Sequence, residues 1–425
     1  MLVVFNLGFR AFFLLSSVLA VILMALWVPA FIGGRALGTY YGQIGWHSHE
    51  MIFGYAVGVI AGFLLTAVRN WTERPTATGA SLAALVTLWL LGRILPFFAE
   101  TIPGWLISVF DLAFLPVCTA IIGLPLVRHG EKRNLLFLPL MTALFAANLL
   151  VHLELLGLVP GIARHGIFLG LYLIILLIVI MGGRVIPFFT ERALPGVVIK
   201  RRPVIEWLAP ITVIAFMLAE LLSPRSELAG ALAGLASIIN GIRVLSWYSH
   251  RYWQVPLLWV LHLGYGWIVV GFLLKAAAGF GLIAAQFTIH AFTIGGIGVL
   301  TLGMMARVSL GHTARPLKVG FSMTVAFVLV NVAAILRVFY RRFFRSGFSA
   351  CLTKRHALDC SLPDFHHRLC ADFDPAQDRR SARLRPWANS ITCSRKVRTY
   401  SARRSDAYER ALGMCGAIVV QTGLN

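Results

Sequence analysis

The residues best able to do chemistry in this chain are seven histidines, His47, His49, His152, His165, His262, His290 and His312. Neutral imidazole is a common ligand of haem iron and of copper. Ionisable side chains are costly at membrane depth, so they usually mark a site or a pathway there. A single imidazole can also simply form an interhelical hydrogen bond. As a set the histidines favour a metal or cofactor site, and all but His165 are predicted metal ligands.

The segment 46–51 carries two of these histidines two residues apart. In a helix His47 and His49 would point to opposite sides, whereas in an extended lead-in they could share one metal. Glu50 could orient an imidazole by a hydrogen bond, or could simply be an acidic residue at a helix N-terminus. The sequence leaves both alternatives open.

Three arginines are candidates for binding a cofactor, namely Arg10, Arg184 and Arg307. Each lies near the predicted cytoplasmic face, where a guanidinium could fork onto a haem propionate. Each could equally be a positive residue that anchors a span on that side.

A proton route would need carboxylates inside the spans, and few are present. Glu154, Glu220 and Asp111 are the candidates. We favour interhelical or helix-end polar contacts for all three, and no catalytic residue is assigned.

The composition indicates a membrane protein. The 425 residues are 58% hydrophobic and 13% charged, with a mean hydropathy of +0.80, whereas a soluble domain carries about 25% charged residues. A helix needs about 20 apolar residues to cross the hydrocarbon core. The chain is therefore predicted to be all-α, a polytopic transmembrane helix bundle. The eleven predicted spans are 9–32, 46–68, 79–98, 104–127, 135–157, 165–187, 204–223, 228–248, 255–278, 281–305 and 319–338.

The short connections predict the orientation. Lys and Arg gather after the even-numbered spans, as between residues 127 and 135, and are sparser after the odd-numbered ones. Because cytoplasmic loops carry the excess, these even connections and the N-terminus are predicted to be cytoplasmic. The histidines that fall at the outer face are then His47, His49, His152 and His165.

Two classes of chemistry are excluded by the motifs that the sequence lacks. There is no Cys-x-x-Cys-His, which excludes a covalently attached c-type haem. There is no G-x-x-x-x-G-K-[ST], which excludes an ATP-driven pump within this chain.

Five motifs, in order, resemble those of the NnrS family. They are Phe9–Leu15 (FRAFFLL), Trp46–Met51 (WHSHEM), Ala61–Thr72 (AGFLLTAVRNWT), Gly182–Thr190 (GGRVIPFFT) and Leu302–Thr313 (LGMMARVSLGHT). Together they are highly specific and cover residues 1 to about 338. The departures from the family pattern are minor: Ala11 for the usual Pro, Arg69 where Pro is common and Glu73 where Gly is common.

The resemblance implies a twelve-span, haem- and copper-containing protein of the bacterial inner (plasma) membrane, tied to denitrification, nitrosative stress and the nitric oxide response. Nitric oxide is its implied small ligand, the lipid bilayer its surroundings, and no nucleic acid is expected. Composition and spacing by themselves indicate spans and candidate ligands only. The histidines inside the motifs are His47, His49 and His312, and the resemblance does not say which histidine binds which metal.

The end of the chain departs from the family. After about Phe339 it is basic, cysteine-rich and without an apolar period. We predict a transmembrane domain over 1–340 and an out-of-frame or disordered basic tail over 341–425. With a shift of one base, permitted codons for residues 369–383 can read YAPILTRPRIDGRPG, which resembles the family's ending. We therefore favour a frameshift over a natural basic tail that meets anionic lipid.

Competing function classes remain open. In the leading hypothesis, a haem iron, with or without a copper nearby, binds nitric oxide or electrons within the bundle, and whether a substrate is turned over is left undecided. The alternative is a transporter or export channel for a metal or small anion, with Gly-rich helices along its path. In a third, the histidines only pack helices. The presence of bound metal distinguishes the first hypothesis from the third, and solute flux in liposomes distinguishes the first from the second.

Overall fold

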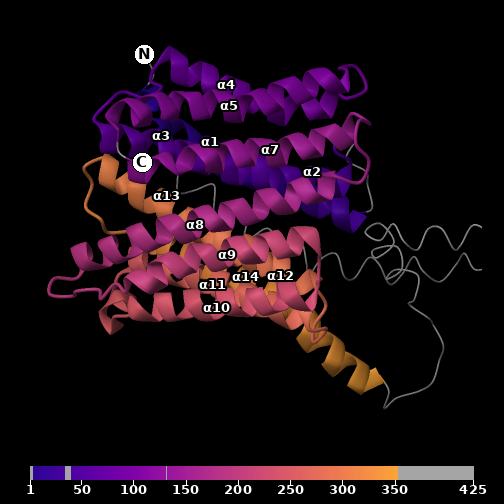
Figure 1. Ribbon diagram of the computed structural model, residues 1–425, viewed down its shortest axis with the longest axis vertical. Coiled ribbons are helices and arrows are strands. Elements are labelled where there is room, and N and C mark those ends of the chain that lie inside the picture. Colours follow the sequence, from indigo (N-terminus) through magenta and orange to yellow (C-terminus); the bar gives the residue numbers. More distant parts are fainter. Residues whose placement is uncertain (1–2, 34–39, 131, 353–425) are drawn as a thin grey trace, which may run out of the picture. The chain divides into compact units, whose positions relative to one another are not determined.

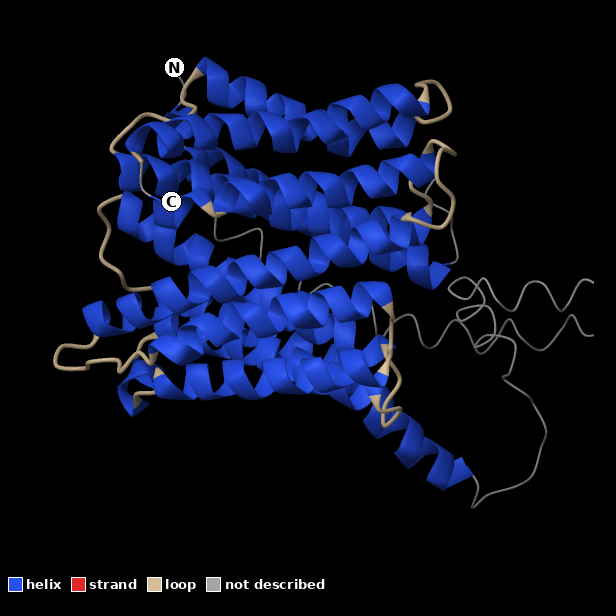
Figure 2. Cartoon of the chain, viewed as in Figure 1, coloured by secondary structure: helices blue, strands red, loops and turns tan. Residues whose placement is uncertain are grey.

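The computed structural model describes residues 3–33, 40–130 and 132–352, and all regular structure in these ranges is helical (Figure 2). The α-helices are α1 (Gly8–Gly33), α2 (Gln43–His49), α3 (Val57–Thr72), α4 (Ala80–Ile94), α5 (Gly104–His129), α6 (Lys132–Leu135), α7 (Phe137–Leu155), α8 (Ala163–Ala193), α9 (Pro203–Leu222), α10 (Glu227–Ser246), α11 (Pro256–Gly279), α12 (Gln286–His290), α13 (Val299–His312) and α14 (Phe321–Leu352). Short 3-10 helices are η1 (Val3–Asn6), η3 (Leu95–Phe98) and η4 (His250–Gln254), and π-helices are η2 (Glu50–Ala56) and η5 (Ala291–Gly298).

The predicted bundle is confirmed. Within the described residues, eleven helical segments are long and apolar enough to cross a membrane, and they lie side by side along a common direction (Figure 1). All backbone groups of such a helix are satisfied internally, which is what a bilayer demands. The chain is therefore a multipass helical membrane protein.

The tenth span is longer and begins later than predicted. Its membrane-spanning segment is Thr288–His312 rather than 281–305, and its helix begins with α12 at Gln286. Gly281 adopts a φ of 72° in the turn after α11, a conformation that glycine tolerates best. The helix also continues past its most apolar part. The predicted span 281–305 puts His290 near its middle and His312 in the loop that follows. In the structure His290 lies near the start of the span, and His312 is the last residue of α13.

Each π-helix of the described residues begins directly after a histidine. η2 follows His49 and η5 follows His290. A π-helical stretch widens the turn and changes the direction of side chains before and after it, and such stretches are frequent at functional sites. Both π-helices pack against α8, so α8 lies next to both.

Residues Met1–Val338 form one compact unit, and the division of the chain falls between Val338 and Phe339. Every contact discussed below lies in the first unit. The predicted domain limit at 340 stays a prediction, and the predicted tail, 341–425, lies outside the described residues beyond Leu352.

Successive antiparallel spans bring alternate helix ends together. The start of α2, the end of α4, the start of α5 and the end of α7 share one end of the bundle, which we call the His49 end (right in Figure 1). The start of α9, the end of α10, the start of α11 and the end of α13 share the opposite end, which we call the Arg243 end (left in Figure 1).

Candidate metal centre

The segment 46–51 is helical from its start, which settles how its two histidines are placed. His47 stacks on Trp27 with ring centroids 4.3 Å apart and 9° between planes. His49 points away from it into the protein, where it is fully buried and contacts Phe53 one turn on. The two imidazoles therefore serve different surroundings and do not share a metal.

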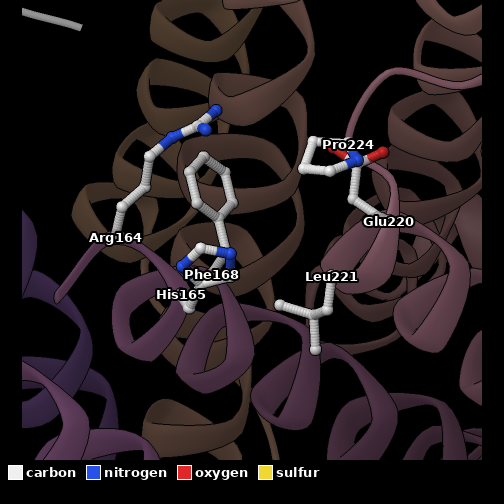
Figure 3. Close-up of a pocket in the computed structure, with 6 residues that line it drawn as sticks. All are labelled: Arg164, His165, Phe168, Glu220, Leu221 and Pro224. Atoms are coloured by element: carbon white, nitrogen blue, oxygen red, sulfur yellow. The ribbon is translucent and has the colours of Figure 1, made fainter. Parts of the chain in front are cut away.

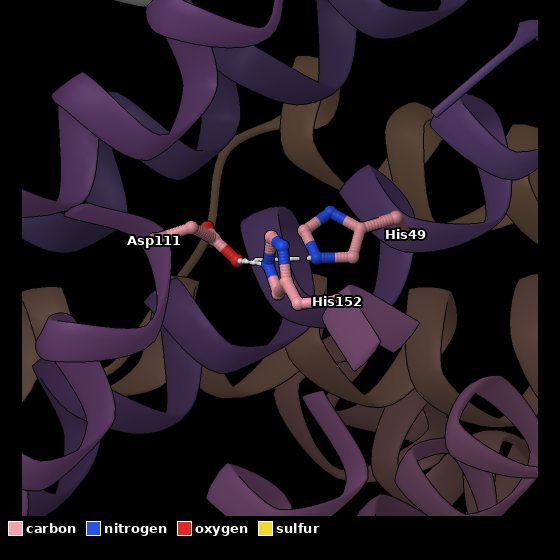
Figure 4. A group of neighbouring side chains, drawn as sticks. All are labelled: His49, Asp111 and His152. Atoms are coloured by element: carbon pink, nitrogen blue, oxygen red, sulfur yellow. Dashed lines mark hydrogen bonds and ion pairs between the residues drawn. The ribbon is translucent and has the colours of Figure 1, made fainter. Parts of the chain in front are cut away.

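His49, Asp111 and His152 converge from three spans (Figure 4). The Nε2 atoms of His49 and His152 lie 3.3 Å and 2.9 Å from the same carboxylate oxygen, Asp111 Oδ2. One ligand atom of each of the three residues lies within 4.8 Å of the others, and all three side chains are buried. Two imidazoles and a carboxylate at this spacing are a donor set used by copper, zinc and non-haem iron.

A second layer of polar side chains holds this triad in place. Glu50 Oε1 lies 3.1 Å from His49 Nδ1, and Asn148 Oδ1 lies 2.8 Å from His49 Nε2. The Asn148 amide also donates to Asp111 Oδ2 over 2.8 Å. A carboxylate on the far nitrogen of an imidazole fixes its tautomer and orientation when the near nitrogen binds a metal.

Arg93 pairs with both carboxylates of the cluster. Its Nε lies 2.9 Å from Glu50 Oε2, and a terminal nitrogen pairs with Asp111 Oδ1. With neutral imidazoles, two carboxylates face one guanidinium, so one negative charge is in excess. The neighbours of both His49 nitrogens are oxygen acceptors, so without a metal His49 satisfies them best with a proton on each nitrogen. A bound cation could replace the proton on Nε2 and balance the same charge.

Glycines let the helices that carry these groups approach closely. A Cβ at Gly92 of α4 would lie 3.2 Å from the Asp111 Cα on α5. A Cβ at Gly54 in η2 would lie 2.7 Å from Glu50 Oε2 and 3.1 Å from a terminal nitrogen of Arg93. Either methyl group would displace the charged side chains or separate the helices.

Two tyrosines just before α2 cover the cluster. The Tyr41 ring stacks on His49 with centroids 4.0 Å apart, and the Tyr40 ring lies over His152 at 5.7 Å. Burial, reinforced by the charges of Asp111 and Glu50, raises the pKa of Tyr41 well above its usual value. The Tyr41 phenol is therefore neutral, and it shields the site from solvent without adding charge.

The remaining predicted ligands lie elsewhere. His262 is near the start of α11 at the Arg243 end, where it stacks on Tyr252 at 4.2 Å. His290 precedes η5. The exposed His312 lies against Phe9 at 5.5 Å.

The three arginines predicted to bind a cofactor also separate. Arg307 is 4% exposed, with its guanidinium 3.8 Å from the centroid of the Phe189 ring and without a carboxylate partner among the described residues. Arg10 lies against Phe9 at 5.9 Å. Arg184 instead donates to Asn134 Oδ1 over 3.0 Å, so it links two helices.

The three candidate carboxylates have different roles. Glu154 accepts a hydrogen bond from the Ala163 backbone over 2.6 Å at the start of α8, and Glu220 pairs with Lys275 at 2.5 Å. Both are polar contacts of the kind that the sequence favoured. Asp111 differs, since it is the shared acceptor of the cluster.

A second network, buried except for the partly exposed Glu206, lies at the Arg243 end. Arg243 donates to Glu206 Oε2 over 3.0 Å, to the Val179 carbonyl over 2.8 Å and to the Tyr265 hydroxyl over 3.1 Å. That hydroxyl donates to Asn240 over 2.6 Å. One cation meets one carboxylate here without an imidazole, so this network is neutral and saturated.

Sequence reasoning missed Arg93, Asn148 and the central role of Asp111. Arg93 lies inside a predicted span, and an ionisable residue at membrane depth was the signal that could have singled it out. Nothing in the pattern distinguishes Asn148 from an ordinary interhelical contact, because only the fold brings it to His49.

Fold and site together define a class: multipass helical membrane proteins with a buried histidine–carboxylate centre at one end of the bundle. Within it, the chain belongs to the NnrS family, whose sequence profile, described as NnrS protein, matches residues 3–353. The resemblance of the five motifs is thereby confirmed. No curated protein and no solved structure matches the chain.

Proposed function

We propose that this chain is a haem- and copper-binding protein of the bacterial inner membrane that binds nitric oxide, or passes electrons, in the nitric oxide response. The observation that carries the proposal is the convergence of His49, His152 and Asp111 around one carboxylate oxygen. Membership of the NnrS family supports the choice of haem and copper. The positive connections support a cytoplasmic N-terminus, which puts the His49 end outside.

His49, Asp111 and His152 would hold the copper. Their imidazole and carboxylate donors fit copper. Glu50 would orient His49 through Nδ1. Arg93 would keep both carboxylates ionised and in place. Bound copper would supply an electron-accepting centre that can also take a small ligand.

His262 of α11 and Arg307 of α13 are the residues that would hold a haem at the opposite end. The Nδ1 of His262 donates to the Leu258 carbonyl over 3.0 Å, which leaves Nε2 as the nitrogen with a lone pair. That Nε2 is buried and has no partner at hydrogen-bond geometry in the described part of the chain, although the Trp247 backbone also lies close to the ring. This is the tautomer that an axial ligand needs. The buried guanidinium of Arg307, which meets no described carboxylate, suits a propionate.

The test is metal analysis and visible spectroscopy on the full chain purified in detergent. We expect His152→Ala to abolish bound copper and to leave the haem Soret band, and His262→Ala to do the opposite. His47→Ala is the matched control, because its imidazole stacks on Trp27 outside both places. The reduced wild type should also shift its Soret band when nitric oxide is added.

Two results would contradict the proposal. Copper retained in both His152→Ala and His49→Ala would exclude the cluster as the copper site. Wild-type protein without any haem band or bound metal would remove the metalloprotein hypothesis altogether and return the transport alternative to the front.

A further inference from the structure

A second polar site lies between the start of α8 and the end of α9, at the His49 end (Figure 3). It shares no lining residue with the His49 cluster. It is a shallow, half-open pocket of about 20 Å³, with room for roughly one or two water-sized groups, so that a ligand bound there would lie partly outside it. The residues that line it are Arg164, His165, Phe168, Glu220, Leu221 and Pro224. Neither the proposed metal chemistry nor the family assignment uses this pocket.

The one carboxylate in the pocket wall is already neutralised. Glu220 Oε1 lies 2.5 Å from the ammonium of Lys275, and the two residues are only 8% and 7% exposed. The Lys275 ammonium also lies 5.9 Å from the centroids of the Phe168 and Tyr172 rings. Glu220 is thus paired with the buried Lys275 and is not available to pair with the cation on the other side of the pocket.

Arg164 is that cation. It lies over Phe168 at 5.2 Å, and it has no carboxylate partner among the described residues. The neighbouring His165 has a buried Nδ1 without a hydrogen-bond partner in the described part of the chain. The pocket therefore combines one uncompensated positive charge with an unused imidazole nitrogen, and both fit an anion that accepts hydrogen bonds.

We propose that this pocket binds a monovalent oxyanion. The forked guanidinium of Arg164 would take two oxygens of such a group, His165 would donate from Nδ1, and the Phe168 ring would form the apolar wall. The same chemistry is offered by a small free oxyanion and by the phosphodiester of a phospholipid headgroup. The inference is independent of whether the chain binds haem or copper.

The test uses the full chain in an uncharged detergent after its lipids have been washed away. In the first arm, the midpoint of thermal unfolding is compared in sodium formate and in sodium chloride of equal ionic strength. In the second, native mass spectrometry compares retention of phosphatidylglycerol with retention of diacylglycerol of the same chain length. We expect formate to raise the midpoint by about 2 °C, or phosphatidylglycerol to be retained preferentially.

Three variants separate the pocket from a general effect of charge. Arg164→Gln should abolish the formate shift or the lipid preference, whereas Arg69→Gln, an exposed arginine of α3, should keep it. Glu220→Gln should strengthen the same effect, because it leaves the positive charge of Lys275 behind the pocket wall without its carboxylate partner. A general loss of stability cannot explain an effect that disappears in Arg164→Gln and increases in Glu220→Gln.

Each outcome decides the matter. An Arg164-dependent effect of formate identifies a free oxyanion site, and an Arg164-dependent retention of phosphatidylglycerol alone identifies a headgroup site. The proposal is wrong if neither probe has an effect in the wild type, or if Arg164→Gln responds as the wild type does.

Discussion

The charge networks at the two ends of the bundle are built from similar residues but differ in how their charges are balanced. At the Arg243 end, one guanidinium is matched by one carboxylate and several neutral acceptors. At the His49 end, two carboxylates share one guanidinium, and two imidazoles complete the set. The first network needs nothing more, whereas the second is balanced only when a proton or a bound cation joins its imidazoles. Burial alone therefore does not mark a site; the imbalance of charge within a buried cluster does.

The largest expected effect is the loss of metal from Asp111→Asn. The substitution keeps the shape of the side chain but removes the shared anionic acceptor of His49 and His152. We expect the affinity for copper to fall by at least about 100-fold, because loss of a direct ligand exceeds the 10–100-fold effect of an outer partner. Competition with a copper chelator, followed by metal analysis, measures it.

Glu206→Gln is the control for that substitution in the other network. It also neutralises a carboxylate that pairs with an arginine, and it should leave copper binding unchanged while it lowers the unfolding midpoint. If both variants lose copper to the same extent, the loss in Asp111→Asn is only a consequence of instability, and the contrast between the two ends fails.

Glu50→Gln should have the next largest effect. Glutamine can still accept a hydrogen bond from His49 Nδ1 but no longer favours the positive charge that develops on the imidazole when Nε2 binds a metal. We expect copper affinity to fall 10- to 100-fold, with the protein still folded. Equal affinity in Glu50→Gln and the wild type would reduce Glu50 to a partner of Arg93 alone.

The sequence predicted the architecture well for a physical reason. Hydrocarbon imposes long apolar helices, so a count of about 20 apolar residues per span identified all eleven. The predicted span limits were wrong where a helix continues beyond its most apolar residues. His312 lies in the helix and not in the loop for that reason.

The candidate site could be predicted only in part. His49 was singled out by its motif and His152 by its depth, and the predicted orientation placed both at one face. That Asp111 and not His47 joins them depends on the helical turn at 46–51 and on how α5 faces α7. Neither can be predicted from the spacing of apolar residues. That spacing indicates which face of a membrane helix is buried, but not which polar side chain it contacts.

Alanine at two glycines should produce smaller effects that again differ between the ends. Gly92→Ala would press a methyl group against the Asp111 Cα, at 3.2 Å, and should weaken copper binding as well as stability. Gly183→Ala would press one against the Arg243 guanidinium and should lower stability alone. Overpacking of this kind costs about 1–3 kcal/mol. Unfolding midpoints and copper content of the two variants, measured side by side, test the difference.

The smallest expected effect belongs to the histidine nearest in sequence to the site. His47→Gln removes an imidazole that stacks on Trp27 and that points away from His49 on the same helix. We expect copper affinity to change by less than about twofold, and stability by about 0.5–1.5 kcal/mol through the lost ring contact. Chelator competition on His47→Gln and His49→Gln in parallel gives the measurement. A large loss of copper in His47→Gln would mean that the segment 46–51 unwinds when metal binds, so that both histidines reach one ion, as an extended lead-in would allow.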